Sequence, residues 1–356
     1  MKHHFKSIIF SKTPLESSFI YKREFKIYPI PFEGFPMHKN ANHFPLILES
    51  WTTDEKVPNI PDFLVDMETS VSRSVNQLNR IRQVTNLLSS LTNHRFFIYS
   101  SKLHWSFPLP DNTDEITENI NNLSSKLSFE YYYWPGSKEI NTYTFNSDDF
   151  PSMKFASHHT YYLHDPFEDP NKEIYFPNTI FKALDSYFSL NKTEKKLVDS
   201  VTHLICNGID IQDNMKSLSF LSFVSSLETL INYEYTDKNK GIEFECGECK
   251  RINKSPFTCK KCGNPTWGVA AKFREFLKEF VSSSEDSMKR YRKIYSVRSK
   301  IVHNGLLLIG DSEFNMLLSS LNKEWKLQVE TLQLCRIALN NWLIISHAKK
   351  AENKKG

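Results

Sequence analysis

The chain is poor in glycine and has no long apolar run. Only 10 of its 356 residues are glycine, whereas 27 are phenylalanine, a balance that favours aromatic cores over glycine-rich phosphate-binding loops. The first twenty residues contain one short apolar run, Ile8 to Phe10, which is too short for the core of a secretory signal. No segment approaches the ~20 apolar residues that cross a bilayer. We therefore expect no membrane association and a cytoplasmic location.

Cysteine is also scarce, and four of the six residues lie close together as two C-x2-C pairs separated by nine residues. Two thiolates on one tight turn can bind a single metal ion, and two such turns supply the four sulfurs of a tetrahedral zinc site. Four sulfurs leave no position for an activated water, so we predict one structural Zn²⁺ per chain. The predicted ligands are Cys246, Cys249, Cys259 and Cys262. Cys206 and Cys335 lie in apolar helical patterns and are predicted to be buried thiols.

Length and patterning predict an α+β domain followed by an all-α bundle. Residues 1–165 combine aromatic and β-branched segments, typical of strands, with one long amphipathic helix over 62–91. A proline-containing polar stretch, 166–179, is the predicted linker. The predicted strands of this domain are 18–30, 44–49, 95–100, 128–134 and 141–146.

Residues 180–348 show apolar periodicity of three and four residues, which predicts a helical bundle. A zinc-binding insert is predicted at 241–268, between the second and third helices, and a disordered tail at 349–356. The predicted helices are 194–206, 214–233, 270–282, 285–304 and a final run over 312–348 that forms one helix or two.

Positive charge is concentrated in one region of the chain. The net charge is +4, yet residues 246–304 hold fourteen Lys and Arg against five Asp and Glu, so the remainder is net acidic by five. A basic region favours a polyanionic partner, and the alternative is a solvated lysine-rich surface. The candidate RNA-contacting residues are Lys289, Arg290, Arg292, Lys293 and Lys300.

Arg298 and His303 form an R-x4-H motif within this region, on a predicted helix that stops at Asn304-Gly305. Ile294, Val297 and Ile301 are predicted to form the buried stripe of that helix. The phrase from Tyr295 to His303, Tyr-Ser-Val-Arg-Ser-Lys-Ile-Val-His, resembles the signature of the ApeA-like branch of the HEPN superfamily. The resemblance covers the helical half of the chain, about 180–348.

The resemblance implies a dimeric α-helical bundle and, in many members, a metal-independent endoribonuclease of toxin, abortive-infection or other antiviral defence. In such proteins the R-x4–6-H motifs of two protomers meet in one cleft. For this chain, the resemblance implies that His303 is the general acid/base and that Arg298 is the phosphate-binding residue. Ser299 occupies a variable polar position that is often Asn, Asp or His, and serine is a weaker hydrogen-bonding group. The N-terminal domain would be a sensor or regulatory domain.

The chemistry of these residue types agrees with that reading. Cleavage of RNA through its 2′-OH needs a proton acceptor, a proton donor and positive charge beside the phosphate. Histidine titrates near neutral pH and arginine is a permanent bidentate clamp. A five-residue offset places Arg298 and His303 about 140° apart around a helix, which favours a composite site in a homodimer with two histidines.

Other roles remain open for the same residues. His303 could cap carbonyls at the helix end, and Arg298 could pair with Glu228, which could equally orient it toward substrate. Asn304 is taken as a supporting residue together with Ser299 and Glu228. The alternatives to an enzyme are therefore a non-catalytic RNA- or nucleotide-binding module and an interaction protein whose zinc insert docks a partner or inhibitor. His158 and His159 are predicted to lie in a strand without a metal-binding role.

Overall fold

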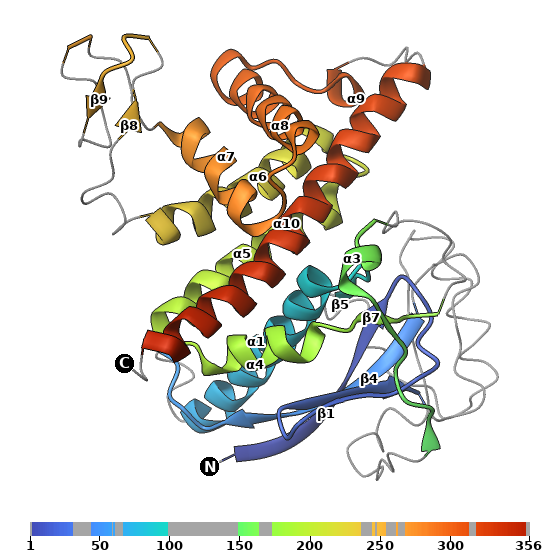
Figure 1. Ribbon diagram of the computed structural model, residues 1–356. Coiled ribbons are helices and arrows are strands. Elements are labelled where there is room, and N and C mark those ends of the chain that lie inside the picture. The colour runs from blue at the N-terminus through green and yellow to red at the C-terminus, as the bar shows by residue number, and fades with distance from the viewer. Residues whose placement is uncertain are drawn as a thin grey trace. The chain divides into compact units, whose positions relative to one another are not determined.

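The computed structural model describes residues 2–30, 44–58, 60, 67–98, 149–163, 173–235, 244–245, 248–253, 261–262, 268–312 and 318–353. An antiparallel sheet forms in the N-terminal part, and the C-terminal part is mostly helical, as the sequence predicts (Figure 1). The chain divides into two compact units. The first comprises Met1–Ser89, His94–Ala156 and Phe167–Pro177, and the second comprises Ser90–Asn93, Ser157–Pro166 and Asn178–Gly356.

The first unit is built on a five-stranded sheet with the strand order β2-β3-β4-β1-β5. Its longest pair joins β1 (Lys2–Ser11) and β4 (Phe44–Thr53) in antiparallel register. Strands β2 (Phe19–Tyr21) and β3 (Phe25–Pro29) form a hairpin, and β5 (Phe96–Phe97) pairs with the end of β1.

Two features of this sheet differ from the sequence prediction. The predicted single strand over 18–30 is a hairpin, because Lys22 adopts a left-handed backbone (φ 50°) at its turn. Strand β1 is not predicted, because it begins with polar residues that give little apolar signal. The predicted strands at 128–134 and 141–146 lie outside the described residues.

Helix α1 (Glu68–Leu91) confirms the described part of the predicted 62–91 helix. Its apolar stripe, which includes Ile81, Val84 and Leu88, is buried. Arg80 ties the helix to the sheet: its guanidinium lies 4.8 Å from the ring centroid of Trp51 and donates to the carboxylate of Glu24 at 2.7 Å. Two short strands, β6 (Phe155–Ala156) and β7 (Phe176–Pro177), pair in parallel elsewhere in this unit.

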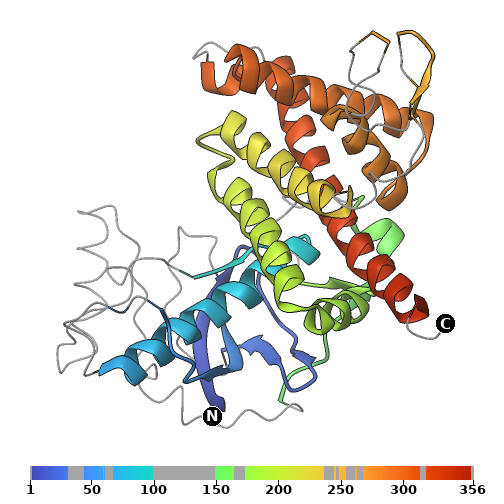
Figure 2. The ribbon, with the colours of Figure 1, turned by 90° about the vertical axis from the view of Figure 1, so that its left-hand side faces the viewer.

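The second unit is a helical bundle in which α5 and α6 lie side by side and α10 packs against α4, α6 and α7 (Figure 2). Among the described residues, no helix combines the length and the apolar character needed to span a bilayer. The helices are α3 (His158–Tyr161), α4 (Ile180–Ser189), α5 (Lys192–Ile211), α6 (Lys216–Tyr235), α7 (Val269–Phe280), α8 (Glu285–Asn304), α9 (Ile309–Ser312) and α10 (Leu318–Asn353).

The prediction of the bundle is correct for most helices and wrong in two places, at α4 and at the end of α10. Helix α4 is not among the predicted helices. The final run, predicted over 312–348 as one helix or two, is formed in its described part by α10, and the short α9 ends at Ser312, where that run was predicted to begin. Helix α10 also extends through residues 349–353, where a disordered tail was expected, because the alanine, lysine and glutamate of that stretch favour helix.

His158 and His159 lie in helix α3, so the predicted strand is wrong at this point. The aromatic neighbours that suggested a strand are instead packed into the bundle: Tyr161 and Tyr162 are buried and stack edge to face with centroids 4.9 Å apart. Burial of these two rings overrides their β propensity. His158 is held by a hydrogen bond between its Nδ1 and the hydroxyl of Thr179, 2.9 Å apart.

The bundle core contains a buried polar network around Arg336 of α10. Arg336 is 1% exposed and donates to the Asn93 side chain at 3.4 Å, and Asn93 in turn donates to the carbonyl of Tyr161 at 2.8 Å. Burial lowers the pKa of Arg336 to about 10. Cys206 and Cys335 are buried as predicted, and burial raises the pKa of Cys335 to about 12, which makes it an unreactive thiol.

Candidate functional site

Helix α8 carries the R-x4-H motif and ends where the sequence predicts. Gly305 adopts a left-handed backbone with φ 66°, and its N–H donates to the carbonyl of Ile301 at 3.2 Å. The N–H of Leu306 donates to the carbonyl of Lys300 at 3.3 Å. Glycine takes this conformation without the steric cost of a Cβ. The helix therefore has a defined last turn, and His303 sits on it.

The buried face of α8 follows the predicted stripe in part. Ile294 and Ile301 are buried, at 1% and 7% exposure, whereas Val297 is half-buried. This face packs against α6 and α7. Because α8 is anchored along one side by these contacts, the residues on its other side stay at the surface of the bundle.

Arg298 lies at the edge of that buried face and forms an ion pair with Glu228 of α6. Its Nη2 donates to Oε2 of Glu228 at 3.1 Å, and the two side chains are 21% and 15% exposed. This is the pairing that the sequence left open for Arg298, and the structure forms it. The second carboxylate oxygen of Glu228, Oε1, is buried and accepts no hydrogen bond within the described part of the chain.

Tyr295 is a neighbour of Arg298 that the sequence reasoning did not identify. The guanidinium carbon of Arg298 lies 5.7 Å from the centroid of the Tyr295 ring, within cation–π range. The ring in turn contacts Phe273 of α7, with centroids 5.4 Å apart. The signal was present in the sequence, because a residue three positions before Arg298 shares its side of a helix.

His303 occupies a different environment from Arg298. Its side chain is exposed, and it makes no hydrogen bond or ion pair with any residue that the structure describes. No such contact joins Arg298 to His303 either, which agrees with their separation of about 140° around the helix. Of the predicted supporting residues, Ser299 is half-buried and Asn304 is exposed. The structure therefore brings Arg298 and Glu228 together and leaves His303 apart from them.

The predicted cationic residues of α8 are all exposed. Lys289 lies 3.3 Å from Glu285 and 3.5 Å from Asp286, both in the first turn of the same helix. The others form no hydrogen bond or ion pair in the described ranges; they are Arg290, Arg292, Lys293 and Lys300. Four uncompensated cations on one helix leave a surface that can bind phosphates.

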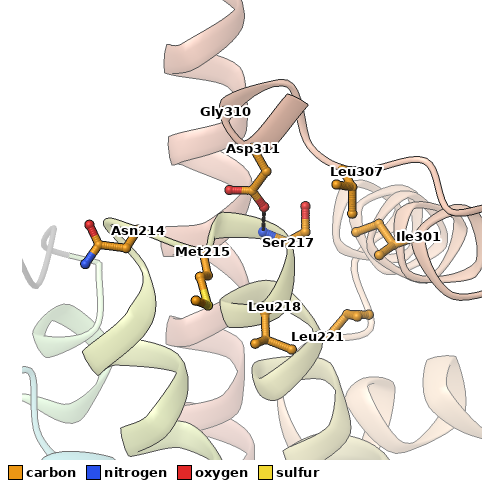
Figure 3. A pocket seen from close by; sticks show the side chains of 9 residues that line it. All are labelled: Asn214, Met215, Ser217, Leu218, Leu221, Ile301, Leu307, Gly310 and Asp311. Carbon is orange, nitrogen blue, oxygen red and sulfur yellow. Dashed lines mark hydrogen bonds between the residues drawn. The ribbon is translucent and has the colours of Figure 1, made fainter. Parts of the chain in front are cut away.

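An open groove of about 440 Å³ lies between the start of α6 and the segment that follows α8 (Figure 3). Asp311 fixes that segment by accepting hydrogen bonds from the backbone N–H groups of Lys216 at 2.8 Å and Ser217 at 2.6 Å. Glu324 of α10 accepts from the N–H of Gly310 at 3.0 Å. The groove is mostly apolar; its lining includes Met215, Leu218, Leu221, Ile301 and Leu307.

The cysteine segment is described in part, and Cys246 and Cys259 lie outside that part. Strands β8 (Phe244–Glu245) and β9 (Ile252–Asn253) pair antiparallel and flank the first C-x2-C turn. Lys250, which follows Cys249, has a left-handed backbone (φ 56°). In the sequence, a glycine follows the second C-x2-C pair at position 263.

The two described cysteines face each other across the segment, with the Sγ atoms of Cys249 and Cys262 3.8 Å apart. A disulfide requires about 2.05 Å. Two sulfurs that each lie ~2.3 Å from one tetrahedral zinc are roughly 3.8 Å apart. The distance therefore fits two thiolates that share a zinc ion and does not fit a disulfide.

A scan of protein-family models, a search of curated proteins and a search of solved structures found no match for this chain. The assignment of a function consequently depends on the residues of the chain and on the geometry described above.

Proposed function

We propose that this protein is a cytoplasmic RNA-binding protein of the HEPN type that cleaves RNA without a catalytic metal. The observation that carries the proposal is the exposed side of α8, where Arg292, Lys293 and Lys300, which have no carboxylate partner among the described residues, lie on the same side of the helix as the exposed His303. A single-stranded polyanion fits this surface, because each phosphate contact releases counterions. Arg298, held at the edge of the same helix by Glu228, is the proposed phosphate-binding residue at the reacting centre.

The proposed reaction is a transesterification within the RNA. The 2′-oxygen attacks the adjacent phosphorus, a new P–O2′ bond forms, and the P–O5′ bond breaks. A neutral imidazole accepts the 2′-OH proton, and an imidazolium donates a proton to the leaving 5′-oxygen, which gives a 2′,3′-cyclic phosphate and a 5′-OH. Histidine can fill either role near neutral pH. Because each chain supplies one His303, the two roles require a second copy.

The surface around His303 supports a homodimer. Val302, Leu306 and Leu307 flank it in sequence and are 48%, 57% and 51% exposed. Met215 and Leu218, which line the adjacent groove, are 53% and 51% exposed. Leu307, Met215 and Leu218 line the same groove, and exposed apolar side chains around a groove mark an interaction surface. We assign this face to a second copy of the chain, whose His303 would complete the acid–base pair.

A second candidate function is favoured by a specific contact. Arg298 is already engaged by Glu228 and is only 21% exposed, and no described contact brings it to His303. A non-catalytic RNA- or nucleotide-binding module would need only the cationic surface of α8, with Arg298 as a structural residue. A role in antiviral or toxin-type defence belongs to the first candidate and rests on the family resemblance alone.

We further propose that the cysteine segment is a structural zinc module. The support is the 3.8 Å separation of Cys249 and Cys262 together with the spacing of all four cysteines. When bound, Zn²⁺ would cross-link the two turns and replace a hydrophobic core in this small insert. A closed four-sulfur site would take no part in the reaction. Docking of a protein partner on this insert is the remaining alternative.

The test is cleavage of mixed RNA by the purified protein in EDTA, beside His303→Ala. Cleavage by the parent with 2′,3′-cyclic phosphate ends, lost in the variant, supports the nuclease. RNA binding without cleavage supports the binding module. If the protein neither cleaves nor binds RNA, the interaction protein is the alternative that stays. Circular dichroism in the same buffer checks that EDTA has not unfolded the chain. A Leu307→Glu variant should run as a monomer in light scattering and should lose cleavage; a monomeric parent would contradict the composite site.

A further inference from the structure

Arg298 is held on two sides by residues from different helices. Glu228 of α6 accepts one hydrogen bond from its Nη2 at 3.1 Å. The Tyr295 ring of α8 lies against the guanidinium, 5.7 Å from centroid to Cζ. The ring of Phe273 of α7 contacts the Tyr295 ring, with centroids 5.4 Å apart. Residues of α6 and α8 therefore contact the cation directly, and α7 supports it through the Tyr295 ring.

The contact with Glu228 uses one of the hydrogen-bond donors of the guanidinium. Arginine has five N–H donors, and Glu228 receives one hydrogen bond from Arg298. The ring contact consumes no donor, because it acts through the face of the π system. Part of the Arg298 side chain, 21%, remains exposed. The arrangement restrains a flexible side chain while keeping donors free for an anion.

Tyr295 is suited to this task because it adds no charge of its own. Burial, and then the neighbouring carboxylate of Glu228, raise the pKa of Tyr295 above its ordinary value, while the charge of Arg298 acts in the opposite direction. The phenol therefore stays neutral at physiological pH and does not compete with a phosphate for the guanidinium.

We propose that Tyr295 is a positioning residue that fixes the guanidinium of Arg298 for an RNA phosphate. The inference rests on the proposed function, since it takes Arg298 as the phosphate-binding residue. Tyr295 itself does not touch the reacting atoms. Its ring prevents Arg298 from swinging away from the pose set by Glu228, and Phe273 supports the ring from α7. The hydroxyl group is dispensable in this role, whereas the ring is not.

The experiment is a double-mutant cycle on the affinity for a 2′-O-methyl RNA, which cannot be cleaved through its 2′-oxygen. Tyr295→Leu should weaken binding by about two- to fivefold, the range of a partly exposed cation–π contact. The same change should have no further effect in an Arg298→Ala background. Tyr295→Phe should recover most of the lost affinity. Tyr233→Leu, which removes a hydrogen bond to Glu194 and a ring contact with Trp342, controls for general loss of stability.

The outcomes separate this inference from the proposed function. Equal RNA affinities of the parent and Arg298→Ala would overturn the role of Arg298, and with it that of Tyr295. A weakened Arg298→Ala beside an unchanged Tyr295→Leu would overturn only the inference. The inference would also be overturned if Tyr295→Leu weakened RNA binding equally in the parent and in Arg298→Ala. The same holds if Tyr233→Leu weakened RNA binding as much as Tyr295→Leu does. Thermal melts of each variant identify any that is unfolded. If Tyr295→Leu is unfolded, Tyr295→Met, a longer apolar side chain without a ring, replaces it with the same expected loss of affinity.

Discussion

Arg298 of α8 donates to Glu228 of α6 at 3.1 Å, and this ion pair joins two helices whose sequence positions differ by 70 residues. The pair is partly buried, so it is less screened than a surface ion pair, and loss of one member leaves the other poorly solvated. This relationship supports two different roles for Arg298, and they predict opposite effects of removing the carboxylate.

Glu228→Gln should distinguish the two roles. If Glu228 orients Arg298 toward RNA, the variant should bind RNA more weakly; if the ion pair withholds Arg298 from RNA, it should bind more tightly. We expect the weaker binding, because one hydrogen bond leaves the other donors of Arg298 free. Glu228→Ala should also lower the free energy of unfolding by about 1–3 kcal/mol, measured by urea denaturation. Unchanged stability in Glu228→Ala would show that the pair contributes little.

The exposed cations of α8 should determine the salt dependence of RNA binding. Replacing Arg292 and Lys293 with Gln should reduce the slope of log affinity against log salt by about 0.7 for each lost phosphate contact. Fluorescence anisotropy at several salt concentrations gives the slope. Lys182→Gln with Lys196→Gln, on α4 and α5 of the same unit, removes equal charge elsewhere. An equal change of slope in this control pair would argue for a general charge effect and against a binding surface on α8.

The cysteine segment should hold one zinc ion. Native mass spectrometry of protein purified without chelator should show one zinc per chain, and Cys262→Ser should reduce the bound zinc strongly. Loss of the ion should unfold the insert before the rest of the chain, because small zinc modules obtain most of their folding free energy from the metal. Protein without zinc, or full zinc in Cys262→Ser, would contradict this prediction. Cys206→Ser is the matched control, since that thiol is buried in α5.

Gly208 of α5 lies directly against the ring of Phe223 of α6. A Cβ at this position would lie 2.4 Å from the Phe223 ring, so Gly208→Ala should cost about 1–3 kcal/mol of stability despite the better helix propensity of alanine. Gly310→Ala is the control: its Cβ would meet the flexible end of Lys216 at 2.3 Å, which can move aside. Thermal denaturation compares the two, and equal losses would contradict the steric argument.

Asp311 should make the stability of the groove depend on pH. Burial opposes its ionisation, but hydrogen bonds from Ser217 and Lys216 outweigh that effect and hold its pKa below the ordinary value. A lowered folded pKa stabilises the protein above the unfolded pKa of about 3.9, and this contribution is lost as the pH falls through the folded pKa. Asp311→Asn should therefore melt at a lower temperature than the parent at pH 7, with the difference shrinking toward pH 3. A difference that is constant with pH would contradict an electrostatic origin.

Local features of the chain account for what could be predicted. The stop at Gly305 follows from the demand for a left-handed residue at a helix end, and the long helices follow from apolar periodicity. Strand β1 and helices α3 and α4 escaped prediction. Strand β1 begins with polar residues that give little apolar signal. For α3 the reason is contact with distant segments, because Tyr161 and Tyr162 are buried in the bundle core.

The amino-acid sequence by itself determined the order of sheet and helices, the helix that carries Arg298 and His303, and the spacing of the four cysteines. Those features depend on neighbours within a few residues. Only the tertiary structure decided that Arg298 meets Glu228 and Tyr295 while His303 stays exposed. That choice depends on how α6, α7 and α8 pack, and packing between helices is set by burial of apolar surface from segments far apart in the chain.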